Sequence, residues 1–318
     1  MRTIGFIKSH KENEKRVAIT LEDLKKIKYK SMVFLEKGYY NNFNIDDEYL
    51  ISLGFNVVSR REVLKKDIIC DPKAGDGDYL NLLSPNTIVF GWIHAVQNKD
   101  ITDKFVENKL TGIAWEDMYE DGRHVFWRNN ELAGEAAIFH AYSIYGKLPY
   151  ETNVALIGRG NIARGALTTL VSLGARVDVY DRKMEALLRK NIGNYDVIVN
   201  GVLWDTNRTD HLIYTEDLKN MKRDSMIIDI SCDKNGGIES SVPTTLENPV
   251  YYTNNVLHYV VDHTPTILFK SASASISKEV VKYLDDLICN RTNNILEEAL
   301  IIKNGNIVDD KIIRYQNR

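Results

Sequence analysis

The centre of the chain carries a glycine-rich turn whose residue types suit the binding of a pyrophosphate. A largely apolar run from Asn153 to Ile157 leads into a Gly-x-Gly-x-x-Ala sequence formed by Gly158, Gly160 and Ala163. The first glycine permits a tight turn, the second lets the backbone approach a phosphate, and the alanine lets a helix pack near the strand. The helix N-terminus adds N–H donors and the positive end of its dipole. The turn therefore predicts a dinucleotide site, to which we assign Gly158, Arg159, Gly160, Asn161 and Ile162.

An acidic residue follows at the distance that such a site requires. The next apolar run ends on Asp181, which lies 23 residues after Gly158, close to the ~20 residues typical of a carboxylate that binds ribose hydroxyls. This spacing favours NAD. Arg182 and Lys183 come directly after it and are of the type that binds a 2′-phosphate, so NADP is the alternative. We assign Asp181, Arg182, Gly201 and Val202 to the cofactor site. A glycine-rich strand–helix turn without a nucleotide is the competing interpretation.

Three basic residues in the first half of the chain each follow a segment that reads as a strand. Arg16 can pair bidentately with a carboxylate, Lys73 can act as a base when it is partly desolvated, and His94 is of the type that titrates near neutral pH. The carboxyl ends of parallel strands meet at one edge of a sheet, where ligands bind. We therefore expect these side chains to share a site. The competing interpretations are a surface arginine, a solvated loop lysine and a structural histidine.

Two acidic residues in the second half follow the same logic. Asp233 comes after the strand predicted over 226–230, and Asp262 lies in the loop that precedes the last long helix. We expect Asp233 to face the nicotinamide side of a cofactor and the loop at Asp262 to line a hinge between domains. Both residues also suit purely structural turns, the first ahead of Gly236 and Gly237 and the second in an Asp-x-x-Pro sequence.

Strands and helices alternate along most of the chain, which predicts parallel sheets. The segments that read as strands are 4–8, 31–36, 56–58, 67–70, 87–92, 110–115, 153–157, 175–180, 197–199, 226–230 and 250–253. The segments that read as helices are 21–28, 46–53, 60–65, 133–145 and 275–289. We expect an α/β protein with two Rossmann-like domains, parallel sheets and an interdomain cleft. The dinucleotide-binding domain, residues 140–271, is inserted in a discontinuous substrate domain of residues 1–139 and 272–318.

The composition limits the classes of protein to which the chain can belong. Its 318 residues fit two domains, and 44% hydrophobic residues with 27% charged residues provide for a buried core. A net charge of −3 gives no electrostatic reason for a nucleic-acid or membrane partner, and no apolar run reaches the ~18 residues of a membrane span. Three widely spaced cysteines, without a metal-ligand pattern, favour the reducing cytoplasm and no metal. We expect small-molecule substrates and a homo-oligomer.

These motifs together resemble the family that contains alanine dehydrogenase, the lysine-forming saccharopine dehydrogenases and N5-(carboxyethyl)ornithine synthase. The resemblance covers nearly the whole chain. It is carried by the first strand with Glu14-x-Arg16-Val17-Ala18, by Lys73 and Gly91-Trp92-x-His94, by the central glycine turn, by Asp229-x-x-x-Asp233 and by Val261-Asp262-His263-x-Pro265. The short chain and the spacing of 21 positions from Lys73 to His94 most resemble the opine-forming synthase branch of this family.

The resemblance implies a reductive condensation of the opine type. A 2-oxo acid such as pyruvate meets the side-chain amine of ornithine or lysine, water leaves, and the imine accepts hydride from NAD(P)H. By resemblance, Arg16 holds a substrate carboxylate, and Lys73 and His94 share the proton transfers. Asp233 and Asp262 lie by the nicotinamide and amine ends of the site. By the same resemblance, related synthases of the carboxyethyl type use NADP and lack an acidic residue at this place. Asp181 is a departure from that pattern and favours NAD.

Two other functions stay open. An amino-acid dehydrogenase that uses ammonia, or a saccharopine-type enzyme that uses 2-oxoglutarate, shares the fold and the catalytic pair and differs in the pocket for the amine. A nucleotide-sensing protein without turnover keeps the glycine turn but needs neither Lys73 nor His94.

Overall fold

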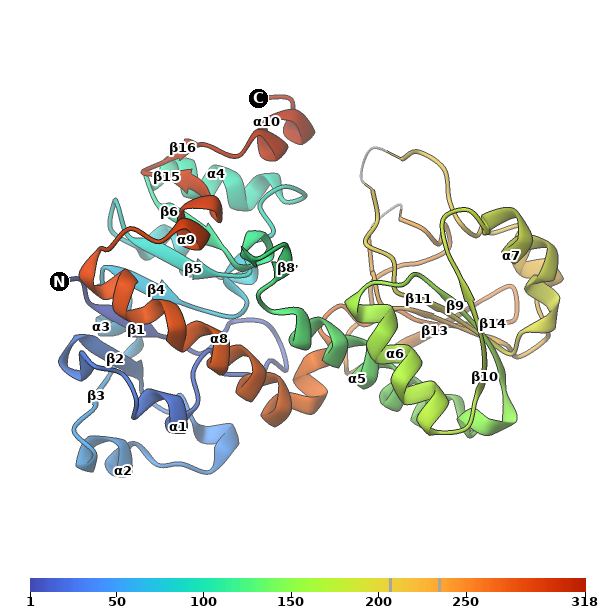
Figure 1. The fold of residues 1–318 in the computed structure, drawn as a ribbon, viewed down its shortest axis with the longest axis horizontal. Helices are drawn as coiled ribbons and strands as arrows, with labels where there is room; N and C mark the ends of the chain where they lie inside the picture. Colours follow the sequence, from blue (N-terminus) through green and yellow to red (C-terminus); the bar gives the residue numbers. More distant parts are fainter. Residues whose placement is uncertain (206–207, 234–235) are drawn as a thin grey trace. The chain divides into compact units, whose positions relative to one another are not determined.

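A computed structural model describes residues 1–205, 208–233 and 236–318 of the chain. By its internal contacts the chain divides into two compact units. The first unit combines Met1–Phe126 with Phe269–Arg318, and the second unit, Trp127–Leu268, is inserted between these two segments (Figure 1). Each unit has its own sheet and its own apolar core.

Both boundaries lie earlier in the chain than the predicted ones after residues 139 and 271. Helix α5 (Trp127–Tyr145) therefore belongs wholly to the second unit. The reason is its close packing against helix α6 (Asn161–Ser172), because a Cβ placed on Gly134 would lie only 2.1 Å from the carbonyl oxygen of Ile162. Two helices whose backbones approach this closely form one packed layer, and a boundary inside α5 would divide it.

The first unit is built on an eight-stranded sheet with the order β16-β15-β6-β5-β4-β1-β2-β3. The strands from β6 to β3 are parallel, as predicted, whereas β15 is antiparallel to both of its neighbours. The strands are β1 (Ile4–Phe6), β2 (Val33–Glu36), β3 (Asn56–Val58), β4 (Ile68–Cys70), β5 (Ile88–Gly91), β6 (Thr111–Ala114), β15 (Leu300–Lys303) and β16 (Asn306–Ile307). The helices are α1 (Leu21–Leu24), α2 (Asp47–Ser52), α3 (Arg60–Val63), α4 (Lys99–Glu107), α8 (Phe269–Cys289), α9 (Asn294–Glu298) and α10 (Asp310–Gln316), and a small hairpin joins β7 (Tyr119–Glu120) to β8 (Arg123–His124).

The long helix α8 returns the chain to the first unit and covers one face of its sheet (Figure 1). Its apolar residues Ile276, Val280 and Leu284 lie in the same core cluster as Ile68 of β4, while the next strand residue, Ile69, lies in the cluster on the other face. A strand that is buried on both faces is apolar at consecutive positions. This burial explains why the strands of this sheet are apolar runs and not alternating patterns.

The second unit is built on a six-stranded sheet with the order β10-β9-β11-β12-β14-β13. The first five strands of this order are parallel and β13 is antiparallel to β14. The strands are β9 (Asn153–Ile157), β10 (Arg176–Tyr180), β11 (Val197–Asn200), β12 (Met226–Asp229), β13 (Val250–Thr253) and β14 (Val256–Tyr259). Helices α5 and α6 pack together on one side of this sheet, and α7 (Glu185–Asn191) follows β10 (Figure 1).

The differences from the predicted elements have local causes. Strand β14 was not predicted, and it follows β13 through Asn254 and Asn255, which both have positive φ angles of 50° and 62°. Two such residues form the tight hairpin turn that asparagine favours. The helices predicted over 21–28 and 60–65 are the short helices α1 and α3. The predicted parallel sheets are confirmed as mainly parallel, with β13 antiparallel to β14 and β15 antiparallel to both β6 and β16.

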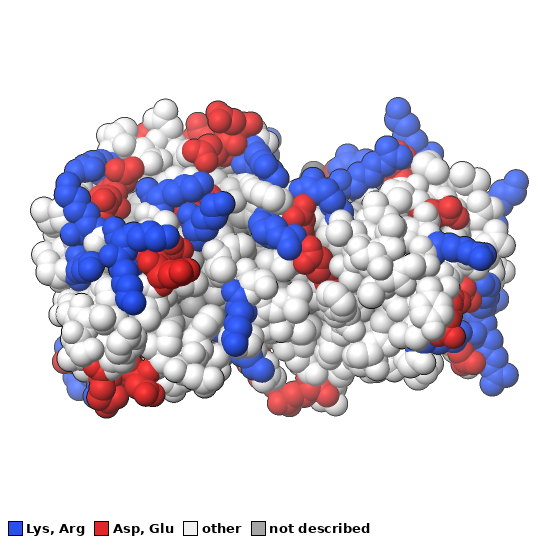
Figure 2. All heavy atoms as spheres, turned by 60° about the horizontal axis from the view of Figure 1, so that its bottom comes forward, with Lys and Arg blue, Asp and Glu red and all other residues white. Residues whose placement is uncertain are grey.

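Charged side chains of both signs are interspersed on the face shown in Figure 2. Among the residues that the structure describes, no helix combines the length and the apolar character that a membrane crossing requires. The three cysteines, Cys70, Cys232 and Cys289, are all free thiols.

Candidate functional site

The glycine turn of the second unit lies where the direction of strand addition changes. From β9 the chain continues to β10 on one side and later to β11 on the other, so the ends of β9 and β11 form a topological switch point. Gly158 has a φ of +108°, and a Cβ there would lie 3.1 Å from the carbonyl oxygen of Gly201. A Cβ on Gly201 would in turn lie 3.0 Å from the amide nitrogen of Ala163. Ligands of open α/β sheets bind at this point, outside the carboxyl ends of the strands.

The N-terminus of helix α6 has the properties of a phosphate site. The helix begins after Gly160, and because glycine has no side chain, no side-chain group caps the first amides of the helix. A Cβ on Gly160 would have no heavy atom within 4 Å, so the backbone borders open space here. The first amide groups of a helix need partners from outside the helix, and the helix dipole favours an anion. The local geometry therefore fits the pyrophosphate of a dinucleotide, as the sequence predicted for Gly158 to Ile162.

Asp181 follows β10 at the same edge of the sheet. Its Oδ2 lies 3.2 Å from Nη2 of Arg159, and its Oδ1 accepts the backbone N–H of Lys183 at 3.0 Å. The side chain of Asp181 is 34% exposed and Arg182 is exposed. A carboxylate in this place suits the ribose hydroxyls of the adenosine half, and the adjacent cations suit a 2′-phosphate. The geometry therefore accommodates both nucleotides.

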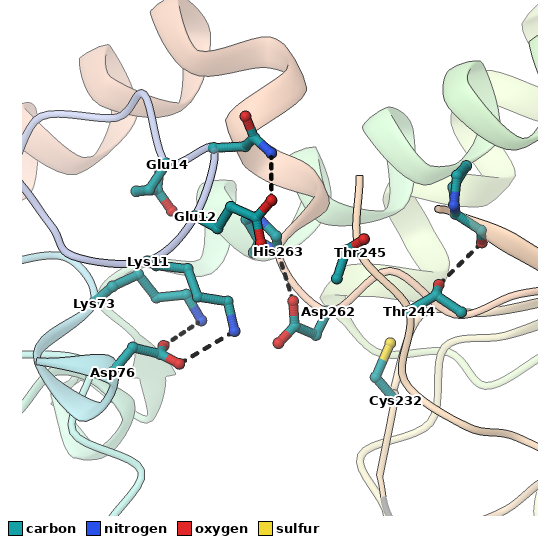
Figure 3. A network of polar contacts seen from close by, with 12 residues as sticks. Lys11, Glu12, Glu14, Lys73, Asp76, Cys232, Thr244, Thr245, Asp262 and His263 are labelled. Atoms are coloured by element: carbon teal, nitrogen blue, oxygen red, sulfur yellow. Dashed lines mark hydrogen bonds and ion pairs between the residues drawn. The ribbon is translucent and has the colours of Figure 1, made fainter. Parts of the chain in front are cut away.

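The two acidic candidates of the second unit have different surroundings. Burial, together with the neighbouring Asp229, raises the pKa of Asp233 to about 6. Asp262 is partly exposed, and its Oδ1 lies 2.5 Å from Nδ1 of the buried His263 (Figure 3). A carboxyl group whose pKa lies near neutrality can exchange a proton in the working pH range. Asp233 thus combines a raised pKa with the position after β12 from which a place beside the nicotinamide was predicted.

The basic candidates of the first unit follow three neighbouring strands. Arg16 comes after β1, Lys73 after β4 and His94 after β5, and these strands stand in the order β5-β4-β1 in the sheet. Since the three strands are parallel, their carboxyl ends lie at one edge. The structure thus brings these three predicted residues to the same edge of the first sheet.

Lys73 shares a carboxylate with a second lysine. Its Nζ lies 3.4 Å from Oδ2 of Asp76, while Nζ of Lys11 lies 3.1 Å from Oδ1 of the same residue (Figure 3). The side chain of Lys73 is only 11% exposed. Its backbone N–H is accepted at 2.9 Å by Asp71, a fully buried residue whose pKa is raised by burial. The turn that carries Lys73 is therefore fixed from below by a buried carboxyl group.

Arg16 forms a buried bidentate pair with Glu14. Its Nε and Nη2 lie 2.7 and 2.5 Å from the two carboxylate oxygens, and the side chains are 3% and 0% exposed. Burial alone raises the pKa of Glu14, but the charge and the hydrogen bonds of Arg16 outweigh it and hold that pKa below its usual value. The guanidinium group also lies over the Trp92 ring, 5.5 Å from its centroid. Arg16 is therefore rigidly placed, and one edge of its fork is already used by Glu14.

His94 has a left-handed backbone that another strand end holds in place. Its φ is 51°, a conformation that few residues other than glycine adopt without a compensating interaction. The carboxylate of the partly exposed Glu116, two residues after the end of β6, accepts the backbone N–H of His94 at 2.5 Å and that of Ile93 at 3.2 Å. The imidazole itself is exposed. Glu116 therefore fixes the turn and leaves the ring accessible.

We expect Glu116 to make the stability of the protein depend on pH. Burial raises the pKa of Glu116 from 4.5 to about 7. Between these values the folded chain holds a proton that the unfolded chain has lost, so this carboxyl group makes stability fall as the pH rises through that window. Thermal unfolding of the wild type and of Glu116→Gln at pH 5 and pH 8 measures the effect. The wild type should lose more stability than the variant over this range.

The exposed Glu298 provides a matched control for this measurement. The variant Glu298→Gln should keep the pH dependence of the wild type. An equal loss of thermal stability between pH 5 and pH 8 in the wild type and in Glu116→Gln would show that Glu116 is ionised without penalty in the folded protein, contrary to the prediction.

Two family models together match most of the chain. The model of the alanine dehydrogenase/PNT N-terminal domain matches residues 5–127, and that of the alanine dehydrogenase/PNT C-terminal domain matches residues 182–316. The chain belongs to the alanine dehydrogenase/PNT family. It is accordingly an NAD(P)-dependent oxidoreductase of that family, and the dinucleotide geometry at Gly158 agrees with this assignment.

Curated members of the family are similar over almost their full lengths. The N(5)-(carboxyethyl)ornithine synthase of Lactococcus lactis subsp. lactis (strain IL1403) is 27% identical over 304 residues, which cover 91% of this chain and 97% of the relative. The enzyme of the same name from Clostridium botulinum is 27% identical, with 88% and 93% covered. Alanine dehydrogenase 1 of Staphylococcus aureus (strain NCTC 8325) is 24% identical, with 99% and 94% covered.

Solved structures of the family have the same fold. An L-alanine dehydrogenase superposes with a TM-score of 0.84 at 19% identity and covers 99% of both chains. A transhydrogenase from Sinorhizobium meliloti superposes with a TM-score of 0.79 at 20% identity, with 97% of this chain and 99% of the other covered. The predicted α/β architecture with two Rossmann-like domains is thereby confirmed.

Several residues of this family member were not assigned to the site from the sequence. Asp71, Glu116 and Asp76 hold the turns or the ammonium groups of predicted residues, and Lys11 shares Asp76. The available signal was their position, because Asp71 and Glu116 come within two residues of the ends of strands that end at the same edge as the basic candidates. Within the described part of the chain, no group of three His, Cys, Asp or Glu residues lies close enough to hold a metal ion.

Proposed function

We propose that this protein catalyses an NAD(P)H-dependent reductive condensation of the opine type. The carbonyl carbon of a 2-oxo acid such as pyruvate is attacked by the side-chain amine of ornithine or lysine. The resulting carbinolamine loses water to give an imine, and the imine carbon accepts a hydride. One equivalent of NAD(P)H is oxidised for each secondary amine that forms.

The observation that carries this proposal is the arrangement of Arg16, Lys73 and His94 after three adjacent parallel strands. The reaction needs a cation for the carboxylate of the 2-oxo acid, a base for an amine whose ordinary pKa is ~10.4, and an acid for the departing hydroxide. Arg16 supplies the cation, and Lys73 and His94 share the two proton transfers. The 27% identity to carboxyethylornithine synthases over nine-tenths of the chain supports this choice of substrates.

We assign the nucleotide to the second unit. The amides at the start of α6 and the backbone of Gly158 and Gly160 bind the pyrophosphate, and Asp181 binds the adenosine ribose, which favours NAD over NADP. When bound, the nucleotide supplies or accepts the hydride. Asp233 would lie toward the nicotinamide end and Asp262 toward the amine, where carboxylates would stabilise a cationic iminium.

The alternative that an observation favours is an amino-acid dehydrogenase that uses ammonia. Alanine dehydrogenase 1 of Staphylococcus aureus matches 99% of this chain, and the solved L-alanine dehydrogenase has the same fold. Such an enzyme needs the same carboxylate cation and the same acid–base pair. It differs in having no pocket for an amino acid.

The deciding experiment follows the oxidation of NADH and of NADPH with pyruvate or 2-oxoglutarate, each combined with ornithine, lysine or ammonia. Mass spectrometry of the product identifies the new C–N bond. Turnover with ornithine or lysine and pyruvate supports the proposal, and turnover with ammonia alone supports the alternative. Turnover with 2-oxoglutarate and lysine indicates a saccharopine-type enzyme. Tight nucleotide binding without any turnover indicates a nucleotide-sensing protein.

Two further expectations belong to the proposal. The active form is a homo-oligomer, which light scattering after gel filtration tests directly. The free state of all three cysteines fits a reducing compartment such as the cytoplasm.

A further inference from the structure

A buried polar pair joins the ends of the two central strands of the second sheet. Asn200 ends β11 and Asp229 ends β12, and the two residues are register partners that are each 1% exposed. Nδ2 of Asn200 donates a hydrogen bond to Oδ1 of Asp229 at 2.9 Å. Neither side chain has a role in the site assigned above. A buried amide–carboxylate pair is costly unless its hydrogen bonds are made, so its partners indicate what it does.

Each member of the pair also holds the loop that follows its own strand. Oδ1 of Asn200 accepts the backbone N–H of Val202 at 3.3 Å. Oδ1 of Asp229 accepts the backbone N–H of Cys232 at 3.4 Å, and Cys232 has a left-handed φ of 53°. The hydroxyl of Ser231 donates to the carbonyl oxygen of Val202, which ties the two loops to each other. The pair is thus the buried centre of a network that fixes both loops.

These loops lie on one side of the switch point. Asp181 follows β10, on the side of the adenosine ribose, whereas β11 and β12 lie on the other side of β9. A dinucleotide that binds across a switch point extends from the first side to the second. The loop at Val202 and the loop that leads to Asp233 therefore lie on the side of the nicotinamide half.

We propose that Asn200 and Asp229 are positioning residues that place these two loops for the nicotinamide half of the nucleotide and thereby place Asp233. This inference rests on the proposed binding of NAD(P)H to the second unit. It does not depend on which amino acid or 2-oxo acid reacts. Burial raises the pKa of Asp229, in keeping with the desolvation of its carboxyl group at the base of the two loops.

The test compares two ligands that differ in the nicotinamide. Isothermal titration calorimetry measures the affinity of the wild type, Asp229→Ala and Asp229→Asn for NADH and for ADP-ribose. Asp229→Ala should bind NADH about tenfold more weakly, because the loops lose a buried acceptor, and should bind ADP-ribose as the wild type does. Asp229→Asn should bind NADH nearly as well as the wild type, since its amide oxygen accepts the same two N–H groups.

Two more variants separate positioning from general loss of structure. Asn200→Ala removes the same hydrogen bond from the other side, and it should reproduce the selective loss of NADH affinity. Asp196→Ala is the matched control, because Asp196 accepts the backbone N–H of Asn153 and the ammonium of Lys222, both at 2.9 Å, ahead of β11 and so away from the loops. It should lower Tm without changing the ratio of the two affinities.

The outcomes distinguish the inference from the proposal on which it rests. If the wild type binds neither NADH nor ADP-ribose, the proposed dinucleotide site itself is contradicted. A wild type that binds both, with Asp229→Ala equal to it or weakened equally for NADH and ADP-ribose, overturns the positioning role. An Asp229→Asn variant as impaired as Asp229→Ala overturns it as well, because the accepted hydrogen bonds would then not be the cause.

Discussion

Replacement of His94 should lower kcat by about 10²-fold or more and leave the affinity for NAD(P)H unchanged. The imidazole is exposed at the carboxyl edge of the first sheet, and proton transfer by a placed side chain contributes typically 10²–10⁴-fold. The choice of variant matters, because His94 has a φ of 51°. His94→Asn is the informative change, since asparagine tolerates this backbone, whereas His94→Ala adds backbone strain to the loss of the ring.

Steady-state kinetics of both variants, together with nucleotide titration, measure this effect. His10→Ala is the matched control, because His10 also lies in a loop of the first unit, after β1. Its Nδ1 lies 3.2 Å from Oδ2 of Asp78. This variant should keep kcat within a few-fold of the wild type. Full activity of His94→Asn would exclude His94 from the acid–base chemistry and would favour a different proton donor.

Replacement of Lys73 by methionine should cause a loss of similar size. Methionine keeps most of the apolar stem of this 11% exposed side chain and removes the ammonium group, whose Nζ lies 3.4 Å from Oδ2 of Asp76. The proposed reaction cannot deprotonate the attacking amine without a base, so kcat should fall by about 10²-fold or more. Nucleotide affinity should not change, because Lys73 belongs to the first unit and the glycine turn to the second.

The neighbouring Lys11 makes this experiment selective. Its Nζ contacts the other oxygen of Asp76 at 3.1 Å, so Lys11→Met removes an equal charge from the same cluster. If the cluster acts only through its total charge, the two variants should be equally impaired. If Lys73 transfers protons, Lys73→Met should be far slower than Lys11→Met. Equal activity of Lys73→Met and the wild type would contradict the role assigned to Lys73.

Much of the fold could be predicted because most of its strands are recognisable in the sequence. Strands such as β4 and β9 are buried on both faces, so they are short apolar runs that end in polar turns. The antiparallel direction of β13 and β15 could not be predicted, because it depends on the strands β14 and β6 with which they pair in the folded chain. The predicted domain boundary at residue 139 falls inside α5, whereas the close packing of that helix against α6 places it wholly in the second unit.

Candidate residues for the site could be selected from the sequence in the same way. Arg16, Lys73 and His94 could be found because each follows a strand of a parallel sheet, and strand ends of such a sheet meet at one edge. Their exact presentation was not predictable. Glu14 occupies one edge of the Arg16 fork, and Asp76 binds both Lys73 and Lys11.

The sequence by itself determined the position of most strands along the chain, the glycine turn with its acidic partner, and the residue types to which we assign nucleotide binding and proton transfer. These features are local, because they depend on residues that lie within one turn or at one strand end. The tertiary structure decided how the chemical groups are held. The carboxyl groups of Asp71, Glu116 and Asp229 accept backbone N–H groups of the turns at Lys73, His94 and Cys232. For His94 the acceptor comes from a different strand, and only the pairing of β5 with β6 brings Glu116 to it.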